Sequence, residues 1–507
     1  MNVQRRLSRR IAATVGAALL LVALLLAMRV LAARMVAVHL LHEAQRQSAT
    51  LRNRQPLWQW ELRQPGDLVA GRAFGHASVT ADGQGLDIVS QDGTPFELGL
   101  PIDRAVDLAH WPLLQLQASA SSGARLDVLQ RTAPDAPLCT ASSAAVLSVG
   151  TQRLTIDLSR LNWTASDSGQ CSAPGQTWLL RLRVQMPQGS HLYLRSAALL
   201  SPEVITLPEH PTWVLSNEAS SSNLDGIHPT TAVPWFELPT GSSAENMLAW
   251  RDRLRSSWPA ALIVPAGFDP KATAPAAMSE GWAWAACLVY LAILLASAAK
   301  PLQGAVRPWF EAAACMAGPL WLIAGLQWKT HPAWPPVIAL VAALLYAAVV
   351  SKRDKVALHG NVGVAQSWLF ALFPLLPTMG LLAVLGQHPA APSIVHALTY
   401  LAWASLQQWL MLAVVLPKLQ QGLAGSFSVD PWPAVMFVAM LFALLHTPNG
   451  ALMQLCLLVE CWWAWCYARS GRLLPIVLAH AGCALIVEAG LLGVLTRSLE
   501  VSARFFL

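Results

Sequence analysis

The sequence predicts an integral membrane protein of mixed fold class: an N-terminal transmembrane anchor, an extracytoplasmic β-sandwich, and a C-terminal polytopic α-helical bundle of about eight spans. Three observations support this prediction. The 507 residues are 55% hydrophobic and only 12% charged, whereas soluble domains are about 25% charged. Apolar runs long enough to cross a bilayer lie near the N-terminus and throughout the second half. Between them, apolar and polar residues alternate in short runs, as they do in half-buried strands.

Residues 1–40 are predicted to be a cytoplasmic basic tail and a transmembrane anchor. The apolar run 11–31 is long enough to span, and no small-residue cleavage site follows it, so we expect an anchor rather than a removed signal peptide. Positive charge favours the cytoplasmic side of a membrane. The tail carries four arginines, Arg5, Arg6, Arg9 and Arg10.

Residues 41–200 are predicted to form the β-sandwich. Turn dipeptides such as Asp82-Gly83 and Asp92-Gly93 separate several of the alternating runs, which is typical of antiparallel sheets. A sandwich can bind carbohydrate or serve as a docking module, and the fold alone does not decide between the two. The alternating runs are 76–81, 86–90, 113–118, 125–131, 153–158, 178–184 and 192–197.

Cys139 and Cys171 are the two cysteines of this polar half. If the region lies outside the cytoplasm, a disulfide between them is expected. The other six cysteines fall in or beside apolar segments without a CxxC pair, and are interpreted as small packing residues.

Residues 201–279 are interpreted as a mixed extracytoplasmic segment ending in a linker at 272–277. Within it, 244–257 reads as a short amphipathic helix. Such a helix can lie on the membrane surface or pack on the sandwich, and the pattern is compatible with both.

Residues 280–507 are predicted to be the polytopic helical domain. With the N-terminus inside, the basic residues fall mainly in cytoplasmic connections, and the outer connections contain only Lys329. This distribution favours a multi-pass protein of the bacterial inner (plasma) membrane with residues 41–278 in the periplasm. The eight apolar runs are 282–299, 308–326, 333–351, 364–386, 394–416, 432–447, 451–468 and 474–495.

The net charge of +6 is explained by this loop asymmetry. No basic patch with interleaved stacking aromatics is present, so nucleic acid is excluded as a partner. The membrane is the predicted partner.

His446 and His480 are the candidate functional residues, because ionisable side chains inside a bilayer are costly and commonly functional. A neutral imidazole can bind a metal or polarise a water. The alternative is a structural histidine bonded to a neighbouring helix.

The segments around these histidines resemble a known family. Phe442 stands four residues before His446, which Thr447-Pro448-Asn449-Gly450 follows, and a basic, glycine-containing turn at 469–473 leads through Pro475 to His480. Over about residues 400–490 this resembles the CAAX-protease and bacteriocin-processing family (CPBP, or Abi). The resemblance implies an intramembrane endopeptidase in which a Glu activates water beside two histidines. Its members are described as metallo- or glutamate-type proteases, so a divalent metal on His446 and His480 is the one cofactor implied, and otherwise none.

Four positions depart from the family pattern. Gln407-Gln408 stand where the family has paired glutamates, Leu412 replaces its arginine, and Ala484 replaces its last polar residue. A carboxamide cannot take a proton from water near neutral pH. Losing a carboxylate and its guanidinium together also avoids leaving one buried charge unpaired.

Another carboxylate could replace the missing base. Glu460, Glu488 and Glu311 lie in or beside apolar runs. The first two fall fourteen residues after His446 and eight after His480. We interpret these acids chiefly as interhelical hydrogen-bond partners.

Three hypotheses follow, and whether the chain is an enzyme stays open. The first is a CPBP-like membrane protein with a degenerate site that binds a peptide or protein partner with an apolar segment. The second is an active intramembrane endopeptidase with an altered motif. The third is a non-enzymatic component of an envelope polysaccharide or secretion system, in which the histidines have no role.

Overall fold

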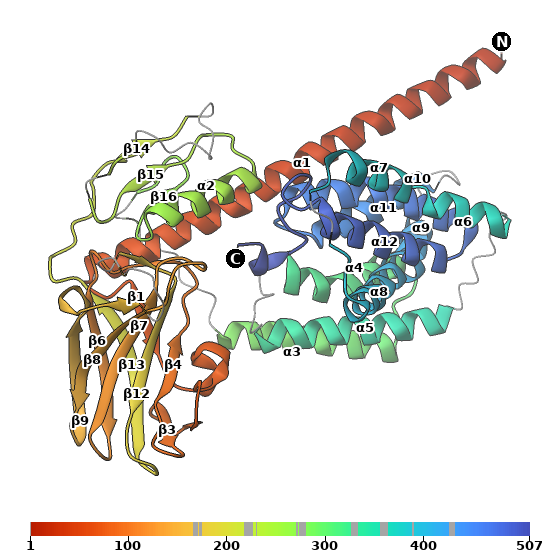
Figure 1. Cartoon of the computed structure of the whole chain (residues 1–507). Coiled ribbons are helices and arrows are strands. Elements are labelled where there is room, and N and C mark those ends of the chain that lie inside the picture. Colours follow the sequence, from red (N-terminus) through yellow and green to blue (C-terminus); the bar gives the residue numbers. More distant parts are fainter. Residues whose placement is uncertain are drawn as a thin grey trace. The chain divides into compact units, whose positions relative to one another are not determined.

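The computed structural model of the chain describes residues 2–165, 171, 175–216, 227–229, 231–269, 272, 280–325, 333–354, 363–387, 390–424 and 431–506. Most of the predicted linker at 272–277 lies outside them. The chain divides into two compact units (Figure 1). The two-sheet unit comprises Val38–Ser242 and Ala249–Pro275, and the helical unit comprises Met1–Ala37, Ser243–Leu248 and Ala276–Leu507.

Two antiparallel sheets make up most of the two-sheet unit. All seven alternating runs that the sequence singled out carry strands, as predicted. The structure adds strands that the alternation did not reveal, among them β4 (Phe96–Leu100) and β8 (Cys139–Leu147). The first sheet has the order β2-β3-β13-β6-β9, with β1 also paired to β13; its bounds are β1 Trp58–Glu61, β2 Ala77–Ala81, β3 Leu86–Ser90, β6 Leu113–Ala120, β9 Gly150–Asp157 and β13 His191–Leu200. The second has the order β10-β8-β7-β12-β4; its bounds are β4 Phe96–Leu100, β7 Ala124–Arg131, β8 Cys139–Leu147, β10 Thr164–Ala165 and β12 Leu179–Gln185.

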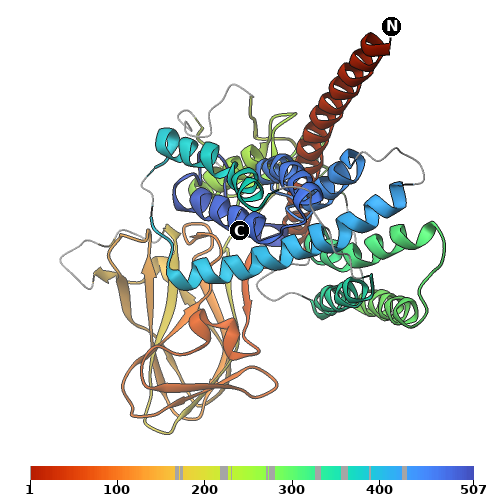
Figure 2. The ribbon, with the colours of Figure 1, turned by 90° about the vertical axis from the view of Figure 1, so that its right-hand side faces the viewer.

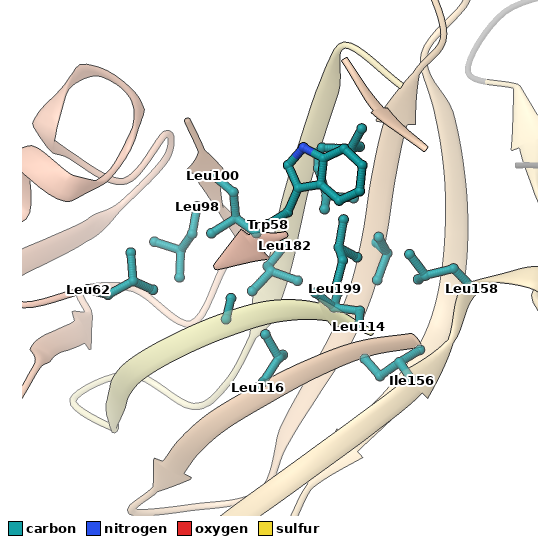
Figure 3. Close-up of a cluster of buried hydrophobic side chains, with 14 of the residues drawn as sticks. Trp58, Leu62, Leu98, Leu100, Leu114, Leu116, Ile156, Leu158, Leu182 and Leu199 are labelled. Carbon is teal, nitrogen blue, oxygen red and sulfur yellow. The ribbon is translucent and has the colours of Figure 1, made fainter. Parts of the chain in front are cut away.

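The apolar faces of both sheets contribute to one core. In β6 every second residue is buried, and Leu114 and Leu116 of this strand belong to the same cluster as Leu182 of β12 (Figure 3). Trp58 of β1 covers one part of this cluster and is 5% exposed. Burial of each such side chain is worth about 1.5–3 kcal/mol. The apolar residues of the alternating runs are therefore the main source of stability of this unit.

Cys139 of β8 and Cys171 are joined by a disulfide bond, with their Cα atoms 5.9 Å apart. The segment after residue 200, interpreted as loop and helix, also contains strands: β14 (Trp213–Val214), β15 (Trp235–Glu237) and β16 (Leu262–Val264) form a small parallel sheet. The predicted helix at 244–257 is α2 (Ala244–Ser257). A further pair, β5 (Val106–Asp107) with β11 (Gln176–Thr177), completes the strands.

All eight apolar runs of the second half contain helix. Six helices of the described chain are long and apolar enough to cross a membrane, including the N-terminal one. Helix α4 (Val306–Ile323) carries Arg307 and Glu311 and is not among them, and α10 (Trp432–Leu444) and α12 (Leu474–Gly490) are shorter. The helices are α1 Asn2–Arg52, α3 Glu280–Ala299, α4 Val306–Ile323, α5 Trp334–Asp354, α6 Val364–Leu372, α7 Leu375–Leu385, α8 Ile394–Gln408, α9 Leu416–Leu423, α10 Trp432–Leu444, α11 Gly450–Ser470 and α12 Leu474–Gly490.

Helices α8 and α9 are parts of one 30-residue helix, Ile394–Leu423 (Figure 2). Between them, Trp409–Val415 is a π-helical stretch. π-Helical turns inside longer helices often occur at functional sites. This one begins directly after Gln407 and Gln408, the positions where the family pattern has its paired acids.

Candidate intramembrane site

His446 and His480 come from different helices. His446 lies in the turn that follows α10, and His480 lies in the first half of α12. Both are buried, at 8% and 6% exposure. Because α12 packs on α8, these elements can bring the histidines and the Gln407-Gln408 pair together.

The turn that carries His446 is held from both sides. The Asn449 side chain caps α11 by accepting a hydrogen bond from the Leu452 backbone N–H, and its amide group donates to the Ser498 carbonyl oxygen at 2.6 Å. Glu245 accepts a hydrogen bond from the Ala451 N–H at 2.8 Å. A carboxylate at a helix N-terminus is favoured by the helix dipole. The start of α11 is therefore fixed beside His446.

One cavity of about 210 Å³ is lined by both histidines together with Gln407 and Ala484. The remaining wall is mainly apolar, and Tyr400 of α8 is one of its few other polar residues. The space is several times the roughly 30 Å³ that a water molecule occupies in the liquid. At least one residue from each of the three motif segments, around Gln407, His446 and His480, thus lines this cavity.

Phe442 links the two imidazole rings. Its ring centroid lies 4.8 Å from that of His446 and 5.6 Å from that of His480, both in edge-on geometry. Trp463 covers another side of His480, with a centroid distance of 5.3 Å. The aromatic contacts hold each ring in one orientation.

The hydrogen bonds assign different roles to the two histidines. His446 Nδ1 lies 2.8 Å from the Phe442 carbonyl oxygen. Since a carbonyl can only accept, Nδ1 carries the proton and Nε2 keeps a lone pair. Around His480, Nδ1 is 3.2 Å from the Gln408 amide nitrogen, which can only donate, so in the neutral ring the proton is on Nε2. Neither Nε2 atom has a hydrogen-bond partner in the part of the chain that the structure describes.

Gln407 and Gln408 have separate positions. Gln407 lines the cavity and makes no hydrogen bond within the described residues. Gln408 is fully buried, and its amide nitrogen donates to Glu460 Oε2 at 2.9 Å. Glu460 therefore makes an interhelical hydrogen bond, as the sequence predicted. The sequence did not predict that Glu460 connects to His480 through Gln408. The one feature that pointed to Glu460 was its position as an acid within the apolar run of α11.

The other acids and Leu412 lie elsewhere. Glu488 pairs with His396 at 2.8 Å. Glu311 lies in a buried ionic cluster, with its Oε2 2.6 Å from Lys418 Nζ. Leu412 is fully buried in the apolar core of the helical unit.

Metal ligands are sparse in this region. Within the described residues, no group of three or more His, Cys, Asp or Glu side chains is placed to hold a metal ion. The cavity wall carries two imidazoles, a carboxamide and the thiols of Cys456 and Cys483, but no three of the His and Cys side chains are grouped as the three protein ligands of a catalytic zinc ion would be. These residues do not by themselves form such a site.

Comparison with known proteins gives one family match. Residues 406–486 match the model of the family described as Type II CAAX prenyl endopeptidase Rce1-like. This confirms the resemblance that the motifs suggested, for the C-terminal part of the chain. The match contains Gln407, His446 and His480.

A further likeness is structural and weak. The family 11 carbohydrate-binding module of the cellulosomal cellulase Lic26A-Cel5E of Clostridium thermocellum is 8% identical, with a TM-score of 0.20, over 25% of this chain and 85% of that one. Similarity at this level indicates no ligand for this chain. No curated protein matches the sequence.

Proposed function

We propose that this chain is a membrane-embedded binding protein of the CAAX-protease type, with a degenerate active site that holds an apolar peptide segment instead of cleaving it. One observation carries the proposal: the cavity between His446 and His480 is lined by Gln407, and no carboxylate is among the described residues that line it. Proton removal from water by a positioned base is typically worth about 10²–10⁴-fold in rate. A carboxamide in that position supplies none of it.

Glu460 does not replace the missing base. It is fully buried and directed to Gln408, and it is not among the residues that line the cavity. A general base has to be within about 3 Å of the proton it takes, or one water away. This geometry favours binding over hydrolysis.

The cavity has the features of a peptide site. Its wall is mainly apolar and includes both histidines. Within the described residues, the acceptor Nε2 of His446 and the donor Nε2–H of His480 have no hydrogen-bond partner. An unwound backbone in a bilayer leaves N–H and C=O groups without partners, which is costly. A donor and an acceptor in one apolar cavity could satisfy one of each.

The rest of the chain suits a bacterial inner-membrane protein with residues 41–278 in the periplasm. Lys352 and Arg353, in the last turn of α5, lie where a cytoplasmic connection is expected. The Cys139–Cys171 disulfide fits an oxidising compartment. The two-sheet unit would then act as a sandwich domain that recognises or docks the partner.

The test uses the full chain in nanodiscs with two synthetic peptides of 20 apolar residues, one continuous Leu/Ala helix and one interrupted by Gly-Gly. We expect the interrupted peptide to bind more tightly and to remain intact by mass spectrometry. His446→Ala should weaken binding about fivefold, since one hydrogen bond is worth about 1 kcal/mol. Ala484→Trp should abolish binding by filling the cavity.

Leu458→Trp is the matched control, because Leu458 lies on α11 with its side chain exposed and outside the cavity lining. It should bind like the unmodified protein. Cleavage of either peptide that disappears in His446→Ala would replace this proposal with an active endopeptidase. Equal binding by all variants would favour the third hypothesis, a non-enzymatic envelope component in which the histidines have no role.

A further inference from the structure

Glu460 is an acid without an evident need in a membrane helix. It is fully buried in α11, and ionisable groups in such places are costly and usually retained for a function. Its partner in the described chain is the Gln408 amide nitrogen, while Glu460 Oε1 has no hydrogen bond there. Because Glu460 does not line the cavity, any effect it has on a ligand passes through another residue.

Gln408 is that intermediate residue. Its amide nitrogen contacts both Glu460 Oε2, at 2.9 Å, and His480 Nδ1, at 3.2 Å. Its Oε1 is buried and has no partner among the described residues, so the contacts of the nitrogen alone determine which way the carboxamide points. Turning the group by 180° would place its oxygen against Glu460 Oε2, and these two acceptor atoms could hydrogen-bond only through a proton on Glu460.

The orientation of Gln408 determines the tautomer of His480. With the NH₂ group toward His480, Nδ1 has to accept, and the ring proton stays on Nε2. With the oxygen there, Nδ1 would have to donate, and Nε2 would become an acceptor. The choice changes the Nε2 atom of His480 from a donor to an acceptor.

We propose that Glu460 and Gln408 are a positioning pair for His480: the acid on α11 orients the carboxamide on α8, and the carboxamide keeps His480 a hydrogen-bond donor. The chain thereby keeps one carboxyl group next to Gln408 and His480. This group is on α11, whereas the family's acids correspond to positions on α8, and it acts on the ligand only through Gln408 and His480. The effect of this pair on peptide binding rests on the proposed function, in which one histidine donates to the peptide backbone and the other accepts from it. The tautomer itself can be measured without any ligand.

The experiment is nitrogen NMR of the full chain labelled with ¹⁵N-histidine, in nanodiscs without peptide, because ring nitrogen shifts distinguish the two tautomers. His480→Ala identifies the His480 signals by difference. The unmodified protein should show the Nε2–H form. Glu460→Gln should keep it, since the new side chain can still present an oxygen to Gln408. Glu460→Leu should give a mixture of tautomers, since nothing then orients the carboxamide.

The sharpest variant exchanges the two residues, Gln408→Glu with Glu460→Gln. The amide at position 460 and the imidazole are two donors beside the new carboxyl group at position 408, and they favour its ionised form. That form can only accept, so His480 should change to the Nδ1–H form. Cys466→Ala, at another buried α11 position, is the control and should leave the signals unchanged. Glu460→Leu should also weaken binding of the Gly-Gly peptide about fivefold, as expected for one lost hydrogen bond.

The two proposals fail in different ways. If no peptide binds but the tautomer follows these variants, the positioning pair stands and the proposed function falls. If peptide binds as proposed while Glu460→Leu and the exchange variant leave His480 in the Nε2–H form, the positioning pair is wrong. Should the exchange variant not fold, Glu460→Leu against Glu460→Gln decides the matter.

Discussion

The Gln408 amide nitrogen lies 2.9 Å from Glu460 Oε2, although the two residues are 52 positions apart in the sequence and belong to different helices. Both are fully buried. This hydrogen bond ties α8 to α11 within the apolar interior of the helical unit. It is therefore expected to contribute to stability as well as to the state of His480.

Loss of one partner should cost more than loss of both. Gln408→Leu leaves a buried carboxyl group without its donor, which costs about 1–3 kcal/mol and more if the group is charged. We expect Gln408→Leu with Glu460→Leu to be closer in stability to the unmodified protein than Gln408→Leu alone. Reversible unfolding of the full chain in bicelles measures the difference. Simple addition of the two single effects would show that the residues are not coupled.

The sequence predicted which residues belong to this site, but not the hydrogen bonds between them. His446 and His480 were expected to meet at one place because of their motifs, and they line one cavity with Gln407. Local spacing could not show that Gln408 is the residue bonded to His480, because that depends on how α8, α11 and α12 pack. A buried glutamate in an apolar run was the available signal for Glu460, but no periodicity identifies its partner.

The Cys139–Cys171 bond should stabilise the two-sheet unit. The two residues are 32 positions apart, and closing a loop of that length is worth about 3–4 kcal/mol in the loop-entropy treatment. Cys139→Ser with Cys171→Ser should lower the unfolding temperature of that unit. In the unmodified protein isolated under oxidising conditions, a thiol reagent should label these cysteines only after reduction. Labelling without reductant would contradict the bond in solution.

Glu97 should make the two-sheet unit sensitive to acid. Burial favours its neutral form, but hydrogen bonds from Arg183 and Arg181 outweigh this and lower the pKa of Glu97 below its ordinary value. A lowered pKa in the folded state gives stability that is present above the ordinary pKa and is lost as the pH falls through the folded-state pKa.

Hydrogen exchange of β4 and β12 in the full chain tests this. Protection should be maintained at neutral pH and decline at a pH below the ordinary pKa of a glutamate. In Glu97→Gln the decline should be smaller, while stability at neutral pH drops by about 1.5–3 kcal/mol, typical of a lost charged hydrogen bond. An identical pH profile for both proteins would exclude Glu97 as the cause.

The topology has a direct test. Loop charges predict nine spans, with residues 360 and 425 in the cytoplasm and Ala390 on the periplasmic side. The first two positions lie outside the described residues. Reporter fusions should be active in the cytoplasm at 360 and 425 and in the periplasm at 390. A cytoplasmic signal at 390 would overturn the arrangement of the bundle.

The strands that the sequence missed have a common cause. β8 (Cys139–Leu147) reads Cys-Thr-Ala-Ser-Ser-Ala-Ala-Val-Leu, in which small residues replace the alternation of large apolar and polar side chains. β4 contains Gly99, whose missing side chain leaves space that Val69 occupies. Both strands are held by pairing with β7 and β12, so their conformation comes from neighbours and not from their own pattern.

Restoring the acid at position 407 should not restore a peptidase. Gln407 lines the cavity, so Gln407→Glu would place a carboxyl group beside the histidines. However, the position of the family's arginine is Leu412, fully buried in the apolar core, and Ala484 offers no polar group to the cavity. A new carboxyl group in apolar surroundings without a cation is expected to stay protonated, and a protonated acid cannot act as a base. We expect no detectable cleavage of the Gly-Gly peptide by Gln407→Glu, as for the control Gln407→Leu. Cleavage by Gln407→Glu that is lost on adding His446→Ala would show instead that the acid alone separates this site from an active one.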